Sequence, residues 1–528
     1  MSHLEVAYQL TSSPFVLAQC LLLFAVPLLL LLLHYGSRRS RSSRHRRSSS
    51  NRCSDDDRSA KGPHLPSPLG LPIISHLHLV SDLPHISLRD LSTKHSRDGF
   101  MLLRLGTVPT LIVSSPRAAE AIMRTHDHVF ASRPTSTVSD DLMYGSSDIA
   151  FSPYGEHWRQ ARKLVTAHLF TVKKVQSYRS ARKEEVSLVL AKAWEAAVAG
   201  TAVDISMMMN TFANDIVSRA VSGQVLPGRR PEQALPGAGG GQLCFVWRVQ
   251  PKDYFPGLAR SLGFLSRRFL RNRAHETHKR WDELLETILS DHERRDSTHR
   301  HDGGDFTDVL LSVQKEYGMT RNHVKAILMD MFAAGTDTWP SYKEKSIRKH
   351  TPEGQETVEE EDLASMPYLK AVVKETLRLH PPAPLLLPRF SMADSIVHGY
   401  YVPSGTRVIV HAWALGRDPE SWENPEEFTP ERFVDGGSAA GVDFKGNHFH
   451  FLPFGAGRRI CPGLNFGMAT VEIMLANLMY CFDWQLPMGM EDKDVDMTEV
   501  FGLPVRPKEK LMLVPKLPCA EVAGPVYM

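Results

Sequence analysis

The sequence predicts a mainly α-helical protein with a small β part, behind an N-terminal transmembrane helix. Hydrophobic residues make up 42% of the 528 residues, which is enough to bury a large core. An apolar run, Phe15–Leu33, has the length of a membrane span. Beyond it, two short segments, Phe100–Leu105 and Thr110–Ser114, have the character of neighbouring strands. Segments with helical period and length dominate: Glu156–Phe170, Arg182–Ala197, Leu270–Arg294, Arg321–Thr338, Pro367–His380 and Leu464–Phe482.

The apolar run is predicted to be an uncleaved anchor at residues 15–34, with residues 1–14 in the lumen. No Lys or Arg precedes it, whereas a signal peptide has basic residues there and a shorter apolar core. Nine Lys/Arg against three Asp follow between Tyr35 and Pro63. Because positive charge stays on the cytoplasmic side, the body of the chain is predicted to be cytosolic.

Residues 35–72 are predicted to form a basic and proline-rich linker that is attracted to anionic membrane lipid. The main domain is expected at residues 73–516 and a tail at 517–528. With 62 basic and 59 acidic residues the net charge is only +3, and the basic excess lies in the linker, so nucleic-acid binding is not expected. The six cysteines form no C-x-x-C pair and are read as reduced thiols.

One cysteine, Cys461, lies in a special loop, Phe451–Gly463, that leads into an apolar helix. A helix N-terminus offers backbone N–H donors and a positive dipole end, which stabilise a thiolate. The glycines allow the backbone to approach a flat ring closely. Phe454 can shield the sulfur from water, and Arg459 can reach an anionic propionate. The alternative, a cysteine that only packs as a small hydrophobe, does not explain this combination.

The loop resembles the haem-binding signature of the cytochrome P450 family, with the five signature positions matched by Phe454, Gly457, Arg459, Cys461 and Gly463. The resemblance implies a cytochrome P450-like fold and haem b, with Cys461 as the axial ligand of the iron. It also implies a monooxygenase that inserts one atom of O2 into a small hydrophobic substrate. Electrons would come from a separate NADPH-dependent reductase, because the chain is too short for a fused flavin domain.

Further motifs match the same family. The stretch from Ala334 to Thr338 resembles its oxygen-activation motif, which implies that Asp337 and Thr338 relay protons. Glu375 and Arg378 stand three residues apart on one helix face, where they can pair. On its own this spacing indicates a surface ion pair. The resemblance adds Arg432 as the third member of a buried structural network.

Trp158 and Arg162 lie four residues apart on one helix face. With Arg389 they resemble the propionate contacts of the family, and guanidinium groups suit carboxylates. Arg159 and Lys163 beside them are candidates for the reductase docking face. The histidine pair in Asn447–His450 is expected to pack rather than to bind metal, because a pair needs a third ligand.

Three stretches resemble the plant microsomal A-type group: Phe151–Arg159, His380–Pro384 and Gly416–Pro419. Members of this group commonly hydroxylate indoles, terpenoids, phenolics or oximes. The resemblance therefore implies a single-pass protein of the endoplasmic reticulum membrane that acts in plant secondary metabolism.

Two segments depart from the family pattern. Pro340 is expected to stop the helix that carries Asp337, and residues 339–360 lack an apolar stripe. Val225–Lys252 is rich in Gly and Pro where the family has a helix. Parts of the helical core are thus expected to be missing, and the hypothesis is that the chain folds poorly or binds haem weakly.

Two other functions stay open. A non-catalytic haem protein would retain the cysteine loop without a competent pocket. If the chain were a membrane-anchored interaction protein without haem, replacing Cys461 by Ala would not change its function.

Overall fold

The computed structural model describes residues 63–223, 251–255, 263–294, 304–336, 356–502 and 504–518. Helices dominate this part of the chain, as predicted. The α-helices are α4 (Pro84–His95), α5 (Pro116–Glu120), α6 (Asp127–Phe130), α7 (Thr137–Leu142), α8 (Glu156–His168), α9 (Val172–Ser177), α10 (Arg179–Ala199), α11 (Ile205–Ser222), α14 (Pro251–Tyr254), α16 (Gly263–Arg294), α17 (Phe306–Val313), α18 (Arg321–Thr336), α19 (Pro367–Leu379), α20 (Ala412–Leu415) and α21 (Leu464–Cys481). Shorter helical turns include η2 (Ala121–Thr125), η5 (Asp362–Ser365), η6 (Pro430–Phe433) and η7 (Gly457–Arg459).

The β part consists of one four-stranded sheet and three smaller ones. The largest sheet has the order β1-β2-β7-β4, in which only the β2–β7 pair is parallel. Its strands are β1 (Phe100–Leu105), β2 (Val108–Val113), β7 (Arg407–Val410) and β4 (Arg389–Phe390). The smaller sheets are formed by β3 (Val203–Asp204), β11 (Met512–Lys516) and β8 (Asp483–Gln485), by β5 (Ser395–Val397) and β6 (Tyr400–Val402), and by β9 (Glu499–Val500) and β10 (Arg506–Pro507).

The first predicted strand is confirmed, because β1 begins and ends at the predicted residues, Phe100 and Leu105. Leu105 pairs with Val108, so only Gly106 and Thr107 form the turn. Gly106 has φ +63°, a conformation that favours glycine at the first turn position of such hairpins. A Cβ at Gly106 would lie 2.5 Å from the carbonyl oxygen of Tyr254 in α14, so this turn also packs too closely for a side chain.

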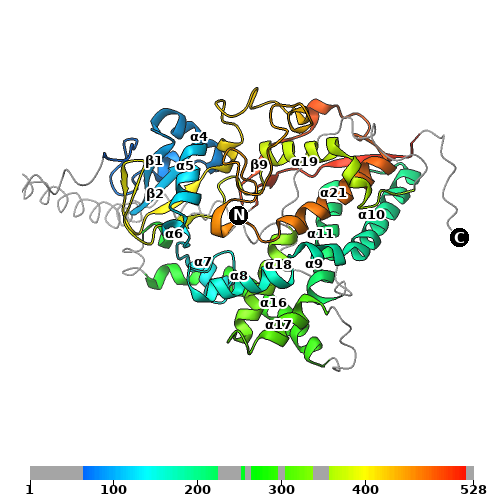
Figure 1. Cartoon of the computed structure of the whole chain (residues 1–528), viewed down its shortest axis with the longest axis horizontal. Helices are drawn as coiled ribbons and strands as arrows, with labels where there is room; N and C mark the ends of the chain where they lie inside the picture. Colours follow the sequence, from blue (N-terminus) through cyan, green and yellow to red (C-terminus); the bar gives the residue numbers. More distant parts are fainter. Residues whose placement is uncertain are drawn as a thin grey trace, which may run out of the picture. The chain divides into compact units, whose positions relative to one another are not determined.

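The main core is formed by helices from distant parts of the sequence. Buried apolar side chains of α10, α11, α16, α18, α19 and α21 make one cluster, and a second cluster joins the four-stranded sheet to the cysteine loop. In Figure 1, β1 and β2 lie beside α4 and α5, while α16, α17 and α18 gather in another region. α18 passes so close to α11 that a Cβ on Gly335 would lie 2.3 Å from Cγ2 of Val217.

The helix α11 was not predicted from the sequence. It begins after Asp204, whose side chain accepts a hydrogen bond from the N–H of Met207 at 2.9 Å, and it ends at Gly223 with φ +74°. Polar residues interrupt its apolar pattern, but Asn214 and Ser218 are buried against other helices. Tertiary packing, rather than an amphipathic stripe, therefore explains this helix.

The proline-rich segment, predicted to be a spacer, is instead part of the folded body. The carbonyl oxygen of Pro66 accepts a hydrogen bond from the N–H of Leu102 in β1 at 2.8 Å. Leu65 packs against the cluster beneath the sheet, and Ser75 forms a bridge with Leu105. The compact unit accordingly begins at Pro63, ten residues before the predicted boundary at residue 73.

The predicted anchor at residues 15–34 lies outside the described residues, as does most of both departing segments. Of the described helices, α21 alone is long and apolar enough to cross a membrane, and 56% of that stretch is buried inside the protein, as in a core helix. Residues 356–360, the end of the second departing segment, are described and are bound to α10, because buried Arg182 donates to Glu360 at 2.6 and 3.0 Å. For the rest of the two departing segments, the loss of helical core stays a prediction.

Candidate functional site

The cysteine loop places Cys461 directly before α21. Its N–H donates to the carbonyl oxygen of Phe454 at 3.0 Å, which closes the loop. Gly457 has φ +68°, and a Cβ there would lie 2.2 Å from the carbonyl oxygen of Met123. Burial raises the pKa of the Cys461 thiol, whereas the N–H of Gly463 and the charge of Arg162 lower it. The sequence thus folds into a helix N-terminus that favours a thiolate when an opposing charge is bound.

A cavity of about 360 Å³ opens in front of this loop. Most of its lining is apolar, with side chains contributed by α8, α11, α18, α19 and α21. Of the predicted cofactor residues, the lining includes Cys461, Phe454, Gly463, Arg162, Arg389 and Arg459. Ala334 and Gly335 of α18 form part of the wall, while Asp337 and Thr338 lie outside the described residues.

Four arginines line the cavity: Arg133, Arg162, Arg389 and Arg459. Burial lowers the pKa of all four, and in Arg459 burial and the neighbouring Arg389 and Arg162 lower it to about 9. Guanidinium groups nevertheless stay protonated in proteins. Burial is the main cause of the lowered pKa values, and in Arg133 and Arg459 the charge of neighbouring arginines adds to it, so this region holds an excess of positive charge. Two carboxylates would relieve it, so this region fits the propionate side of a haem.

The arginines are held by backbone carbonyl groups. Arg459 donates to the carbonyl oxygens of Ala131, Ile149 and Ser152 at 2.7, 3.1 and 2.7 Å. Arg133 donates to that of Ala150 at 2.9 Å. Rigid positioning by carbonyl groups orients these cations without neutralising them.

The side chain of Arg389 forms an ion pair with a carboxylate, whereas that of Arg162 does not within the described residues. Arg389 donates to Oδ1 of Asp127 at 2.9 Å and to the carbonyl oxygen of Ala456 at 2.7 Å. Within the described part of the chain, Arg162 makes no hydrogen bond or ion pair, and it lies close enough to Cys461 to alter its pKa. Arg162 is thus the cation most available to an incoming anion.

Trp158, predicted as a propionate contact, does not line the cavity. Its indole N–H donates to the carbonyl oxygen of Ile149 at 3.1 Å. Its ring stacks on the guanidinium of Arg459, whose Cζ lies 4.1 Å from the ring centroid. Trp158 therefore supports Arg459, and its propionate contact stays a prediction. Gly457 also lies outside the lining, and its role in haem binding likewise stays a prediction.

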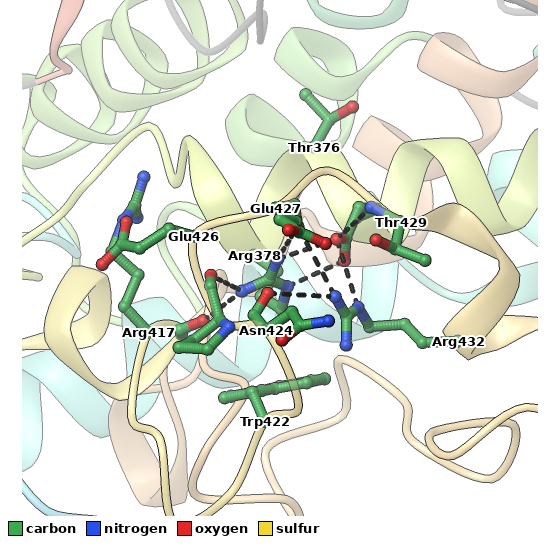
Figure 2. Close-up of polar contacts among 12 residues, drawn as sticks. Thr376, Arg378, Arg417, Trp422, Asn424, Glu426, Glu427, Thr429 and Arg432 are labelled. Atoms are coloured by element: carbon green, nitrogen blue, oxygen red, sulfur yellow. Dashed lines mark hydrogen bonds and ion pairs between the residues drawn. The ribbon is translucent and has the colours of Figure 1, made fainter.

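Glu375, Arg378 and Arg432 meet in one buried network. The Glu375 carboxylate accepts from Arg378 at 2.7 and 2.7 Å, from Arg432 at 3.2 Å and from the N–H of Thr429 at 2.8 Å. Figure 2 shows the two guanidinium groups side by side, with Trp422 on one side of them. The ring centroid of Trp422 lies 5.2 Å from Cζ of Arg378 and 6.0 Å from that of Arg432. This network joins α19 to η6, away from the cavity.

Neither histidine group within the described residues supports a metal centre. His450 packs its ring edge-on against Trp422 at 5.0 Å, in line with the predicted packing role. His292, Asp305 and Asp308 have ligand-like spacing, but Asp305 caps α17 and pairs with His292 at 2.8 Å. The positive end of α17 disfavours a cation there.

Sequence reasoning missed Asp127, Arg133, Asp148 and Asp330. Asp127 links Arg389 to the cysteine loop, because its Oδ2 accepts from the N–H of Arg458 at 3.1 Å. None of these residues lies in a recognisable motif, and partners of Asp127, Arg133 and Asp330 are distant in sequence. Only the burial of charged side chains reveals them.

Similarity to known proteins covers most of the chain. A family model described as Cytochrome P450 matches residues 65–341 and 344–514. Indole-2-monooxygenase of Zea mays is 50% identical over 94% of this chain and 96% of its own length. Indolin-2-one monooxygenase of Zea mays is 48% identical over 85% of this chain and 88% of its own length.

Among solved structures, a zebra fish cytochrome P450 with abiraterone superposes with a TM-score of 0.65 at 24% identity. The match covers 83% of this chain and 100% of that one, and it shows likeness of fold alone. A solved structure of a zebra fish cytochrome P450 with progesterone gives a TM-score of 0.66 at 23% identity.

Proposed function

Because the chain belongs to the cytochrome P450 family, we propose that it oxidises a small hydrophobic compound of the indole type. Its relatives place it in the plant A-type group, so it is a haem-thiolate monooxygenase. Three relatives from Zea mays are named for indole, indolin-2-one and 3-hydroxyindolin-2-one. They support a bicyclic compound with a nitrogen ring fused to benzene as the substrate class.

The arrangement of Cys461 before α21, in an apolar cavity that four arginines also line, carries this proposal. We propose that Cys461 is the axial ligand and that Arg133, Arg162, Arg389 and Arg459 hold the propionates. When bound, the haem supplies the redox centre at which O2 is reduced by two electrons and one oxygen atom passes to the substrate, the other leaving as water.

The chain's own residues prepare the cavity for that chemistry. Apolar walls from Val217, Val373 and Leu377 exclude water and accept an aromatic ring. In our proposal Asp337 and Thr338, beyond the described end of α18, supply protons to the reduced oxygen. Phe454 limits access of water to the Cys461 sulfur.

The reductase and the membrane complete the proposal. An NADPH-dependent reductase would dock on the exposed basic side chains Arg159 and Lys163 of α8. The predicted anchor at residues 15–34 would hold the protein in the endoplasmic reticulum membrane with the body in the cytosol.

A second candidate function is a haem protein without turnover. Pro340 follows Thr338 by two residues and would end the helix that presents the proton relay. Sequencing the transcript across codons 225–252 and 338–360 would show whether the departing segments belong to the expressed product.

The experiment is a reduced, carbon-monoxide difference spectrum of the full-length chain, followed by turnover of indole with NADPH and a plant reductase. We expect the Soret band of a thiolate-ligated haem and a hydroxylated product. Cys461→Ala should abolish the band, whereas Cys481→Ala, which removes the thiol at the other end of α21, should retain it. A band without turnover would favour the second candidate, and no band in the natural chain would overturn the proposal.

A further inference from the structure

A carboxyl group of α18 holds one wall of the cavity in place. Asp330 is buried and lines the cavity. Its Oδ2 accepts hydrogen bonds from two successive N–H groups, those of Ile149 at 2.6 Å and Ala150 at 3.2 Å. The adjoining Asp148 accepts from the N–H of Phe151 at 2.9 Å. Residues 148–151 are thereby fixed to the helix through two carboxyl groups.

Both carboxyl groups are buried, and they lie close enough for each to shift the pKa of the other. Oδ1 of Asp148 is buried, and no donor of the described residues reaches it. Two bare carboxylates in contact away from water would repel strongly, so one of them must keep a proton. Burial raises the pKa of both, to about 6 for Asp148 and well above its usual value for Asp330, while Arg459 lowers that of Asp148. The proton thus belongs on Asp330 and the charge on Asp148.

The charge balance of the cavity points to the same protonation state. Four arginines line the cavity, and the buried carboxylates beside them are Asp127, which pairs with Arg389, and the Asp148–Asp330 pair. The Cys461 thiolate is left out of this count, because the ferric porphyrin core of a bound haem would balance it. If the pair carries a single negative charge, two positive charges remain. Two propionates would neutralise that remainder. A fully ionised pair would leave only one.

We propose that Asp148 and Asp330 share one proton and act as positioning residues for the haem site. The hydrogen-bonded pair fixes residues 148–151, and the carbonyl groups of this wall hold the arginines: that of Ile149 accepts from Arg459 and that of Ala150 from Arg133. The ionised Asp148 also faces both guanidinium groups. The pair therefore links the distal helix α18 to the cations that would bind the propionates.

The shared proton is tested by infrared spectroscopy of the full-length protein. Natural protein at neutral pH should show the carbonyl band of a buried carboxylic acid that disappears only on alkaline titration. Asp330→Asn should remove this band, because the amide replaces the protonated acid while keeping its shape. Asp282→Asn in α16 removes a carboxylate that accepts from Lys325 at 2.6 Å and should leave the band unchanged. The proposal of a shared proton would be overturned if the band persisted in Asp330→Asn. It would also be overturned if the natural protein lacked the band.

The positioning role is tested by amide hydrogen exchange and haem content in the same variants. In Asp330→Asn the amide oxygen can accept from Ile149 and Ala150 and its NH2 can donate to Asp148, so exchange and haem content should match the natural protein. Asp330→Leu should speed exchange of the Ile149 and Ala150 amides by roughly tenfold or more, because each loses a hydrogen bond to a strongly polar group. It should also lower the haem content. Unchanged exchange in Asp330→Leu would overturn the role. So would equal losses of haem in both variants.

Discussion

Glu375 is the side chain whose removal we expect to be most damaging outside the cavity. It is fully buried and accepts from Arg378, Arg432 and the N–H of Thr429. Glu375→Ala leaves two guanidinium groups buried with no counter-charge. Arg378 retains carbonyl partners at Gly416, Pro425 and Glu427, which do not neutralise it. Breaking a buried pair in this way costs about 3–5 kcal/mol of unfolding free energy.

The assay is urea unfolding of the haem-loaded protein, followed in parallel by far-UV circular dichroism and Soret absorbance. The matched control is Glu120→Gln in α5, which removes the exposed ion pair with Arg124 and should change stability by less than ~0.5 kcal/mol. If the free energy of unfolding of Glu375→Ala lay within about 1 kcal/mol of that of the natural protein, the guanidinium groups would have to be solvated, which contradicts this prediction.

Three further predictions concern packing and pH. Gly335→Ala forces a methyl group against Val217 and should cost about 1–3 kcal/mol, measured by thermal unfolding. Gly457→Ala introduces a Cβ that would lie 2.2 Å from the carbonyl oxygen of Met123 at a left-handed backbone position, and haem content should fall. Burial and a neighbouring histidine of α8 lower the pKa of His323. Because the folded state disfavours its charged form, stability should fall as pH drops below about 6.5, and His323→Gln should weaken this pH dependence.

Each of these predictions has its own control. The double change Gly335→Ala with Val217→Ala should restore stability relative to Gly335→Ala, and a further loss would contradict the close approach of α11 and α18. Gly441→Ala, with open space around its Cβ, should retain full haem content. His157→Gln removes the ring 4.3 Å from that of His323, so it should also weaken the acid sensitivity; an unchanged pH profile would count against this pair.

The helices with strong periodicity were predictable, because their apolar faces form the core. α8, α18, α19 and α21 begin at the predicted residues, and their described ends differ from the predicted ones by one or two residues. α11 escaped prediction because the polar Asn214 and Ser218 are buried in its interface. Burial of polar side chains depends on neighbours that local sequence does not reveal.

In the candidate site too, some residues were predictable from the local sequence and others were not. Cys461 was predictable because its loop is continuous in sequence. Arg133 and Asp127 were not, because their partners lie hundreds of residues away: Arg133 donates to Leu387 and Asp127 accepts from Arg389. Trp158 was placed on the correct helix, but its role as support for Arg459 depends on the backbone at Ile149.

The packing of the proline-rich segment has a practical consequence for producing the body without the predicted membrane anchor. A shortened chain that starts at residue 73 would lack Leu65, which covers the apolar cluster beneath the sheet, and Pro66, the acceptor for Leu102 of β1. One that starts at or before Pro63 would retain both. The choice of first residue therefore decides whether the outer edge of β1 keeps its hydrogen-bond acceptor at Pro66. An uncovered strand edge would favour aggregation of the isolated body.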